Sequence, residues 1–175
     1  FKKLKNLFNN NKKILEVGSG TCQLSSFFAI GTTNQVCAFD ATYESLEEGR
    51  KFAEKNKIKN INFIQGNILE SNFTKDYFDL VLVNGVLHHT SNPNLGFKNC
   101  IYALKKGGVI VLGLYNSYGR FSTMLLRFIY KFFGKKVISF LDPVSRNMKV
   151  EKSEKEAWIE DQFNHPLERT YSFKE

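Results

Sequence analysis

The residues best suited to bind a ligand lie between residues 12 and 24. An apolar, β-branched run contains Glu16, the glycines Gly18 and Gly20 follow one residue apart, and a helix-forming segment comes next. This order is typical of a strand, a tight turn and a helix N-terminus. Glycines in such a turn allow positive φ angles and let a ligand approach main-chain N–H groups that the helix start leaves unpaired. The stretch therefore predicts a ligand-binding turn.

Two features of this turn indicate the kind of ligand. The dinucleotide pattern G-x-G-x-x-G/A fails at its third position, because Gln23 stands where a small residue is needed. The carboxylate of Glu16 would repel a pyrophosphate but attract a ligand that carries an ammonium or sulfonium group. A cationic ligand therefore fits these residues better than a dinucleotide does.

The same turn resembles the first motif of the class I S-adenosylmethionine (SAM) dependent methyltransferases, E-x-G-x-G-x-G. Glu16, Gly18 and Gly20 match the motif, and Cys22 stands where its third glycine usually is. The resemblance implies that SAM is the cofactor and S-adenosylhomocysteine the product. It also implies a cofactor site that includes Glu16, Gly18, Ser19, Gly20 and Cys22.

An acid follows the second apolar run, 35–39. Asp40 lies 22 residues after Gly18, and an acid near this spacing is typical of one that binds a ribose. We therefore assign Asp40 and its neighbour Ala41 to the cofactor site. The alternative is that Asp40 only complements the dipole of the next helix.

The third apolar run, 61–65, is followed by Asn67 and Ile68. In class I methyltransferases an Asp or Asn here pairs with the adenine amino group and an apolar neighbour packs on the ring, and the resemblance implies these roles for Asn67 and Ile68. An amide oxygen can accept the N–H without carrying a charge. The alternative is that Gly66-Asn67 forms an ordinary turn.

The fourth apolar run, 77–83, leads into the segment N-G-V-L-H-H. Ligands of open parallel sheets bind beyond the carboxyl ends of the strands, so we expect this segment to form the wall beside the reacting methyl group. The stretch F-D-L-V-L-V-N-G-V-L-H-H also resembles the fourth motif of the same family. The predicted cofactor residues here are Asn84, Gly85, Val86 and Leu87.

The paired histidines His88 and His89 are candidates for a general base, because an imidazole titrates near neutral pH. Packing or hydrogen bonding beside the cofactor is the alternative. Adjacent side chains on a turn point apart, and the only other histidine is His165, so we expect no metal site.

Alternation of apolar runs with amphipathic segments predicts an α/β fold, a Rossmann-like, doubly wound and mostly parallel sheet. The resemblance implies the strand order 3-2-1-4-5. The predicted strands are 14–17, 35–39, 61–65, 77–83 and 109–114, and the predicted helices are 21–30, 43–57 and 93–105. The expected inward residues of these helices are Leu24, Phe27, Phe28, Leu46, Phe52, Ala53, Leu95, Ile101 and Leu104. Because only 137–141 is a candidate for the two strands that normally complete such a sheet, we expect a truncated sheet in a fragment of a longer protein.

Residues 116–175 are expected to form a helical cap on a SAM-binding core, 1–115, within one domain. Apolar residues recur every three or four positions from Phe121 to Phe133, with basic residues between them, which predicts an amphipathic helix. Such a helix usually packs on its own domain or on a second copy of the chain. Peripheral contact of 120–136 with an anionic membrane is the alternative.

Two segments of this region suggest an acceptor pocket. The stretches L-Y-N-x-Y-G-R (114–120) and D-Q-F-N-H-P-L-E-R (161–169) together resemble cap sequences of some bacterial members of the superfamily. The candidate substrate-binding residues are Tyr115, Asn116, Tyr118, Trp158 and His165. An ordinary surface helix and a turn ended by proline are the alternative.

Composition limits the class of protein. The 175 residues are 42% hydrophobic, enough for one buried core, and they contain neither a spanning apolar run nor a signal peptide, so we expect a cytoplasmic protein. Three cysteines without C-x-x-C spacing predict free thiols. Lys and Arg number 25 against 17 Asp and Glu, a net charge of +8 that would help to bind an anionic partner, although a merely solvated basic surface is the favoured explanation.

These features predict a SAM-dependent methyltransferase that acts by direct displacement on a small-molecule, lipid or glycan-intermediate acceptor. No N/D-P-P-aromatic run and no Pro-Cys follows the fourth strand, which argues against two kinds of nucleobase methylation. The alternatives are a tRNA or other nucleic-acid methyltransferase, a non-catalytic SAM-binding subunit and a dinucleotide oxidoreductase. The sequence leaves the acceptor and the oligomeric state open.

Overall fold

The structure is a computed structural model that describes residues 1–164 and 168–172. The chain divides into two compact units, residues 1–114 and 115–175. Each unit is described by itself below.

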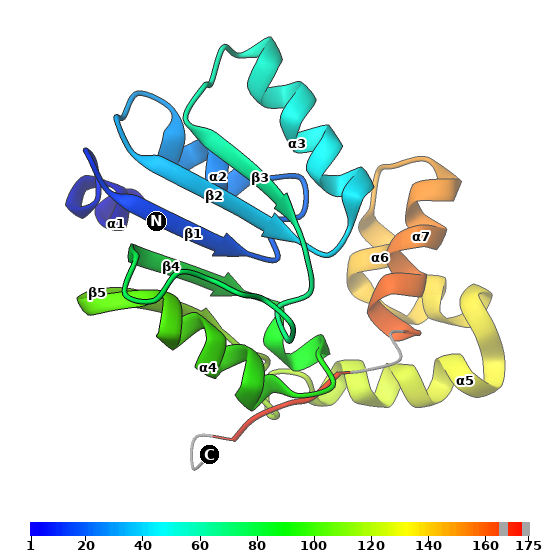
Figure 1. The fold of residues 1–175 in the computed structure, drawn as a ribbon. Coiled ribbons are helices and arrows are strands. Elements are labelled where there is room, and N and C mark those ends of the chain that lie inside the picture. Colours follow the sequence, from blue (N-terminus) through cyan, green and yellow to red (C-terminus); the bar gives the residue numbers. More distant parts are fainter. Residues whose placement is uncertain (165–167, 173–175) are drawn as a thin grey trace. The chain divides into compact units, whose positions relative to one another are not determined.

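The first unit is built on a five-stranded sheet whose strands are all parallel (Figure 1). The strands are β1 (Lys13–Val17), β2 (Gln35–Asp40), β3 (Ile61–Gln65), β4 (Phe78–Asn84) and β5 (Leu104–Gly113). Their order is β3-β2-β1-β4-β5, which confirms the predicted α/β fold and strand order. The central strands β1 and β4 read as nearly continuous apolar runs because helices and loops cover both of their faces. In the described residues no sixth strand joins this sheet.

Helices pack on both faces of the sheet. The helices of this unit are α1 (Lys2–Leu7), α2 (Gln23–Ala29), α3 (Tyr43–Lys55) and α4 (Pro93–Ala103), with a short 3₁₀ turn, η1 (Leu87–His89). α1, α2 and α3 pack on one face, where Phe28 is fully buried. On the other face α4 buries Cys100 and Ala103 against β1 and β4. The three cysteines are free and buried, as expected from their spacing.

The structure corrects three details of the predicted helices. α4 ends at Ala103, because Leu104 already pairs with Phe78 at the start of β5. Leu95 and Ile101 are exposed rather than inward. The small residues Pro93, Gly96, Cys100 and Ala103 face the core instead, and they let the helix lie close to the sheet. Phe52 of α3 is likewise exposed, whereas Leu46 and Ala53 are buried as predicted.

The second unit is helical in its described residues. It contains α5 (Phe121–Leu141), α6 (Pro143–Asn147) and α7 (Lys152–Phe163). Its core consists of Ile138, Ile159 and Phe163. The suggestion that 137–141 forms a strand is wrong, because these residues continue α5 and place Ile138 in this core. Gly134 has a φ of +73° and interrupts α5, which therefore consists of two helical segments.

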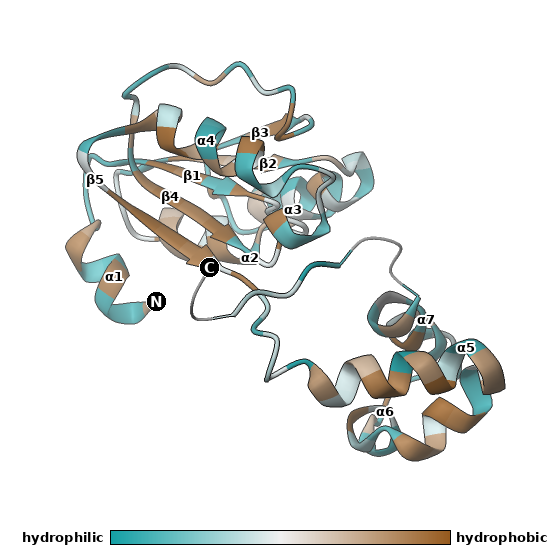
Figure 2. Ribbon diagram, turned by 90° about the horizontal axis from the view of Figure 1, so that it is seen from below, coloured by the Kyte–Doolittle hydropathy of each residue, from teal (hydrophilic) through white to brown (hydrophobic). Residues whose placement is uncertain are grey.

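Many residues of α5 are hydrophobic (Figure 2). Phe121, Leu125, Phe128 and Phe132 follow the helical repeat and are all more than half exposed. The predicted amphipathic helix therefore exists, and the described residues of its own unit leave this apolar face uncovered. No helix in the described part of the chain is long and apolar enough to cross a membrane.

Candidate functional site

The predicted cofactor residues lie at one edge of the sheet. The glycine turn follows β1, Asp40 ends β2, Asn67 comes two residues after β3, and Asn84 ends β4. All four strands are parallel, so their carboxyl ends meet at the same edge, which is where ligands of open α/β sheets bind.

Asp40 connects the glycine turn to the start of α3. Its Oδ2 accepts a hydrogen bond from the Gly20 N–H at 2.7 Å, and its Oδ1 accepts one from the Thr42 N–H at 2.8 Å. Asp40 therefore holds the glycine turn in place and also supports the entry to the next helix. Each carboxylate oxygen retains a further lone pair for a ligand hydroxyl.

The main-chain N–H groups of the turn are largely used by the protein itself. Gly18 and Ser19 both donate to the carbonyl of Phe39, at 2.7 and 3.1 Å, and Cys22 donates to the carbonyl of Ser19 at 2.8 Å. The expectation that unpaired N–H groups of this turn would face a ligand is therefore wrong for these residues. These three N–H groups are therefore not available to a ligand, whereas the carboxylates of Glu16 and Asp40 lie at the same turn and favour a cation.

Glu16 is a buried carboxyl group beneath the turn. It is 8% exposed, and the hydroxyl of Ser25 in α2 donates a hydrogen bond to its Oε2. Burial raises the pKa of Glu16 to about 7, and nearby Asp40 adds to the rise, while the hydroxyl and the N–H of Ser25 oppose it. A carboxylate in so little water gains strongly from a cation placed beside it.

The turn after β1 contacts the loop after β4 through Val86. Gly18 has a φ of +69°, and a Cβ added to it would lie 2.1 Å from Cγ2 of Val86. Both the backbone conformation and this close approach require glycine at position 18. The two predicted motifs thus form one packed surface.

Cys22 has a backbone conformation that glycine adopts more readily than other residues. Its φ is +59°, in the left-handed region, and its side chain is fully buried. A Cβ added to Gly49 of α3 would lie 2.5 Å from the Cys22 sulfur, so Gly49 provides the space for the thiol. Burial raises the pKa of this thiol, which argues against a role as a nucleophile.

We expect Gly49→Ala to destabilise the protein by about 2 kcal/mol, because the new methyl group overpacks the Cys22 sulfur. The free energy of unfolding in denaturant measures this change. Cys22→Gly in the same chain should restore most of the loss. If Gly49→Ala instead stabilises the chain, as alanine does in an unhindered helix, the tight contact is refuted.

Asn67 and Ile68 lie at the predicted place, although both are used within the protein. Asn67 Oδ1 accepts from the Leu69 N–H at 3.0 Å, and its Nδ2 donates to Glu70 at 3.0 Å, which forms a local turn. Ile68 is 5% exposed and packs in the core with Leu87. The adenine-binding roles of Asn67 and Ile68 remain predictions: Asn67 Oδ1 retains a second lone pair for an amino group, whereas Ile68 has little exposed surface to pack on a ring. Ala41 is exposed next to Asp40.

The loop after β4 presents Asn84 at the edge of the sheet. Asn84 is exposed, and a Cβ added to Gly113 of β5 would lie 2.0 Å from its Oδ1, so Gly113 makes room for this amide. Gly85 turns the chain with a φ of +78°, whereas Leu87 is buried in the core. Asn84, Gly85 and Val86 therefore present surface at this edge, and Leu87 supports them from below.

The two histidines differ in accessibility. His88 is fully buried, whereas His89 is partly exposed, and their ring centroids lie 4.2 Å apart. Only His89 presents side-chain surface to an acceptor in this conformation. Among the described residues no group of three or more His, Cys, Asp or Glu side chains could hold a metal ion.

The candidate acceptor residues of the second unit have mixed environments. Tyr118 is 80% exposed, and Asn116 Oδ1 accepts from the N–H groups of Tyr118 and Gly119 at 3.0 and 3.2 Å. The Tyr115 ring lies 4.1 Å below the guanidinium of Arg120. Trp158 packs against the core of this unit. His165 lies outside the described residues.

The two cap segments identified in the sequence lie side by side. Arg120 of the first segment forms two hydrogen bonds with Glu168 of the second, at 3.1 and 2.7 Å. A parallel bridge joins Asn116 of the first segment to Tyr171, two residues beyond the second segment. Arg127 of α5 also donates to Glu168, at 2.8 Å. At least part of their polar composition therefore serves to hold this unit together.

Ser25 and Gly49 are structural partners of the site that the sequence did not indicate. Ser25 orients Glu16, and Gly49 accommodates Cys22. The available signal for Ser25 was a pair of serines, Ser25 and Ser26, beside the apolar residues on the buried side of α2. Nothing in the local pattern of α3 indicates Gly49.

A sheet of this strand order, with an acid and a glycine turn at β1 and a second acid at the end of β2, is the fold of the class I SAM-dependent methyltransferases. The sequence model of a family described as "Methyltransferase domain" matches residues 8–160. The chain therefore belongs to this methyltransferase family, whose cofactor is SAM.

Curated relatives include the ubiquinone/menaquinone biosynthesis C-methyltransferase UbiE of Shewanella pealeana, 27% identical over 129 residues, 72% of this chain and 50% of that protein. The UbiE protein of Pectobacterium atrosepticum is 29% identical over 105 residues, 58% of this chain and 42% of that protein. The chain thus spans about half the length of the curated relatives it matches.

Solved structures support the fold. PKMT2 from Rickettsia typhi aligns with a TM-score of 0.74 at 16% identity, over 98% of this chain and 39% of that one. The same protein in complex with AdoHcy aligns with the same TM-score at 17% identity, over 91% of this chain and 36% of that one. YcgJ from Bacillus subtilis aligns with a TM-score of 0.63 at 21% identity, over 72% of this chain and 57% of that one.

Proposed function

We propose that this chain binds SAM at the carboxyl edge of the sheet and transfers its methyl group to a small-molecule or lipid-like acceptor. The observation that carries the proposal is the pairing of Asp40 with the Gly20 N–H above the buried Glu16. It brings two carboxyl groups to one glycine turn, an arrangement that suits a ligand with a cationic methionine end and a ribose.

Each end of the cofactor has a candidate partner. Glu16 attracts the positively charged methionine end, directly or through water, and the free lone pairs of Asp40 accept hydrogen bonds from the ribose hydroxyls. Asn67 is the candidate for the adenine edge, and Asn84 with Val86 forms the wall beside the methyl group. These roles require little chemistry from the protein beyond binding and orientation.

The reaction is a direct displacement. The acceptor nucleophile forms a bond to the methyl carbon while the bond from that carbon to sulfur breaks, and the sulfur keeps the electron pair. The protein contributes by holding the two reactants in line and by excluding water. Where the acceptor must lose a proton, the partly exposed His89 is the available base, because His88 has no exposed surface.

Two observations favour an acceptor with an apolar body over a nucleic acid. The curated relatives are named for ubiquinone and menaquinone biosynthesis. The second unit exposes an apolar face on α5, with phenylalanines at 121, 128 and 132, which suits an apolar molecule or one presented at a lipid surface. A tRNA or other nucleic-acid acceptor has only the net charge of +8 in its support.

Two experiments test the proposal. Thermal-shift and calorimetric titrations with SAM, S-adenosylhomocysteine, NAD and NADP should show binding of the first two only, and no response to SAM overturns the proposal. Methyl-labelled SAM incubated with separate pools of small metabolites, lipids, glycan intermediates and tRNA then identifies the acceptor class. SAM binding without transfer to any pool indicates a non-catalytic SAM-binding subunit.

We expect Asp40→Ala to weaken SAM binding more than tenfold, because it removes the ribose acceptor and releases the Gly20 N–H from its partner. Isothermal titration calorimetry measures the change. Glu44→Ala, which removes an exposed acid from the first turn of α3, serves as the matched control and should leave the affinity within about twofold. If Asp40→Ala and the parent protein bind SAM with equal affinity, Asp40 does not contact the cofactor.

A further inference from the structure

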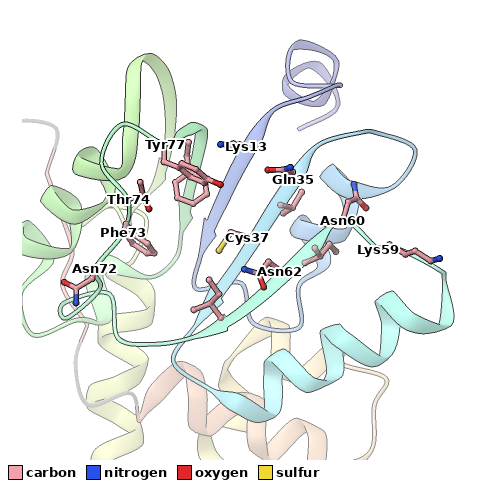
Figure 3. Close-up of a pocket in the computed structure, with 14 residues that line it drawn as sticks. Lys13, Gln35, Cys37, Lys59, Asn60, Asn62, Asn72, Phe73, Thr74 and Tyr77 are labelled. Atoms are coloured by element: carbon pink, nitrogen blue, oxygen red, sulfur yellow. The ribbon is translucent and has the colours of Figure 1, made fainter.

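A groove of about 450 Å³ lies over the amino-terminal ends of β1, β2 and β3, at the opposite end of the sheet from the glycine turn (Figure 3). Lys13 and Gln35 are the first residues of β1 and β2, and Tyr77 immediately precedes β4. Five residues of extended chain, about 16 Å, separate this end of β1 from the turn. The Lys13 end of the groove is therefore distinct from the glycine turn, while at its other end Ile64, Asn72 and Phe73 also border a hollow that contains Asn67.

The groove exists because this part of the sheet face has no helix over it. The connection from β3 to β4, residues 66–77, contains no helix, whereas α4 covers β4 and β5 on the same face (Figure 1). The floor is apolar and includes Cys37, Ile64 and Phe73. A volume of this size matches sites for ordinary small-molecule ligands.

The polar groups around this floor are available to a ligand. Gln35, Asn62 and Asn72 line the groove with exposed side-chain amides that no described residue hydrogen-bonds. In Figure 3 Asn62 stands beside Cys37 in the middle of the groove, and Asn72 lies near the loop wall. These amides supply both donors and acceptors.

The charge of the groove is positive. Its lining contains Lys13 and Lys59 and no acidic residue. The Lys13 ammonium lies 3.7 Å from the centre of the Tyr77 ring, which fixes it at one end of the groove. In the described residues neither lysine side chain forms an ion pair with a carboxylate, and Asp79, whose Oδ2 accepts from the Lys13 main-chain N–H at 2.8 Å, is paired with Lys105 instead. Lys59 lies at the opposite rim.

We propose that this groove binds a small organic anion with a flat apolar body. The anionic group pairs with Lys13, the ring system packs on Ile64 and Phe73, and the amides of Asn62 and Asn72 complete the contact. A carboxylate and a phosphate ester satisfy Lys13 equally, because an ammonium acts as a point charge. The site goes beyond the proposed methyl transfer and does not depend on it.

Calorimetry with 2-naphthoate and its uncharged analogue 2-naphthamide tests the proposal on the full chain. We expect sub-millimolar binding of 2-naphthoate, about fivefold tighter than that of 2-naphthamide, which is the worth of one partly exposed ion pair. Lys13→Met should abolish this preference. Lys3→Met, which removes a lysine from α1 on the other face of the sheet, should leave it unchanged.

Asn62→Trp supplies a second, steric test, because an indole at this exposed position fills the groove. Binding of both naphthalene compounds should be lost, while the melting temperature and SAM affinity stay as in the parent protein. The proposal is overturned if 2-naphthoate binds no tighter than 2-naphthamide, or if Asn62→Trp still binds either. SAM titrations on the same samples test the proposed cofactor site separately. The anion site and the SAM site can therefore each be refuted without affecting the test of the other.

Discussion

SAM affinity is expected to fall about 30-fold between about pH 8 and about pH 5.5, because Glu16 must lose its proton to bind a cation. Burial raises the pKa of Glu16 to about 7 in the ligand-free protein. A bound sulfonium and ammonium favour the carboxylate and lower its pKa in the complex. Below about pH 7 each unit of pH therefore weakens binding about tenfold, until the pKa of the complex is reached.

Calorimetric dissociation constants across this pH range measure the effect. Glu16→Gln is the matched control, because it keeps the size and hydrogen bonding of the side chain without its titration. The residual pH dependence of this variant reports the ionisation of SAM itself. Identical pH profiles for the two proteins would show that Glu16 does not meet the positive end of the ligand.

The same carboxyl group should also affect stability in a defined direction. Its pKa is about 7 in the folded chain and near 4.5 in the unfolded chain, so the folded state binds the proton more tightly. The contribution of Glu16 to stability is therefore fully present below about pH 4.5 and is lost as pH rises to about 7, by about 3 kcal/mol. The difference between the parent protein and Glu16→Gln isolates this contribution from the other carboxyl groups.

Spacing along the chain predicted the sheet and the strand ends at which its candidate ligand-binding residues lie. The apolar runs gave strands within one or two residues of the observed bounds, except that β5 begins five residues early, at Leu104. Asp40 could be predicted because the carboxyl ends of parallel strands meet at one edge of the sheet. An acid that directly follows the second strand must therefore lie at this edge. Periodicity and strand-end chemistry are local properties, and the sequence carries them directly.

Side-chain contacts between distant elements were harder to predict. The pairing of Glu16 with Ser25, the space that Gly49 gives Cys22 and the burial of His88 all depend on how two elements pack. Residues 137–141 resemble a strand in isolation, yet Ile138 completes a core with Ile159 and makes a helix the better solution. Such tertiary contacts override the intrinsic secondary-structure preference of a segment. They produce no regular spacing of residues along the sequence from which they could be predicted.

We expect Glu168→Gln to destabilise the second unit by about 3 kcal/mol. Glu168 is 3% exposed and accepts hydrogen bonds from both Arg120 and Arg127, at distances between 2.7 and 3.1 Å. Removing its charge leaves two largely buried guanidinium groups without a carboxylate, and breaking a buried ion pair by removing one partner costs several kcal/mol. The side chains of Arg120 and Arg127 retain some exposure to water. We therefore expect a loss of stability near the lower end of the range of about 3–5 kcal/mol that is typical of such changes.

Hydrogen exchange of the amides in α5 and α7 measures the effect locally, since the two units can lose structure independently. Glu154→Gln, which neutralises an exposed acid in the first turn of α7, is the matched control and should change exchange by less than about 0.5 kcal/mol. If Glu168→Gln leaves exchange unchanged but lowers methyl transfer, the D-Q-F-N-H-P-L-E-R segment serves the acceptor rather than the fold. Faster exchange throughout α5 would instead show that Glu168 holds the helices of this unit together. Tyr118, which is exposed and takes no part in these ion pairs, would then be the better candidate for contact with the acceptor.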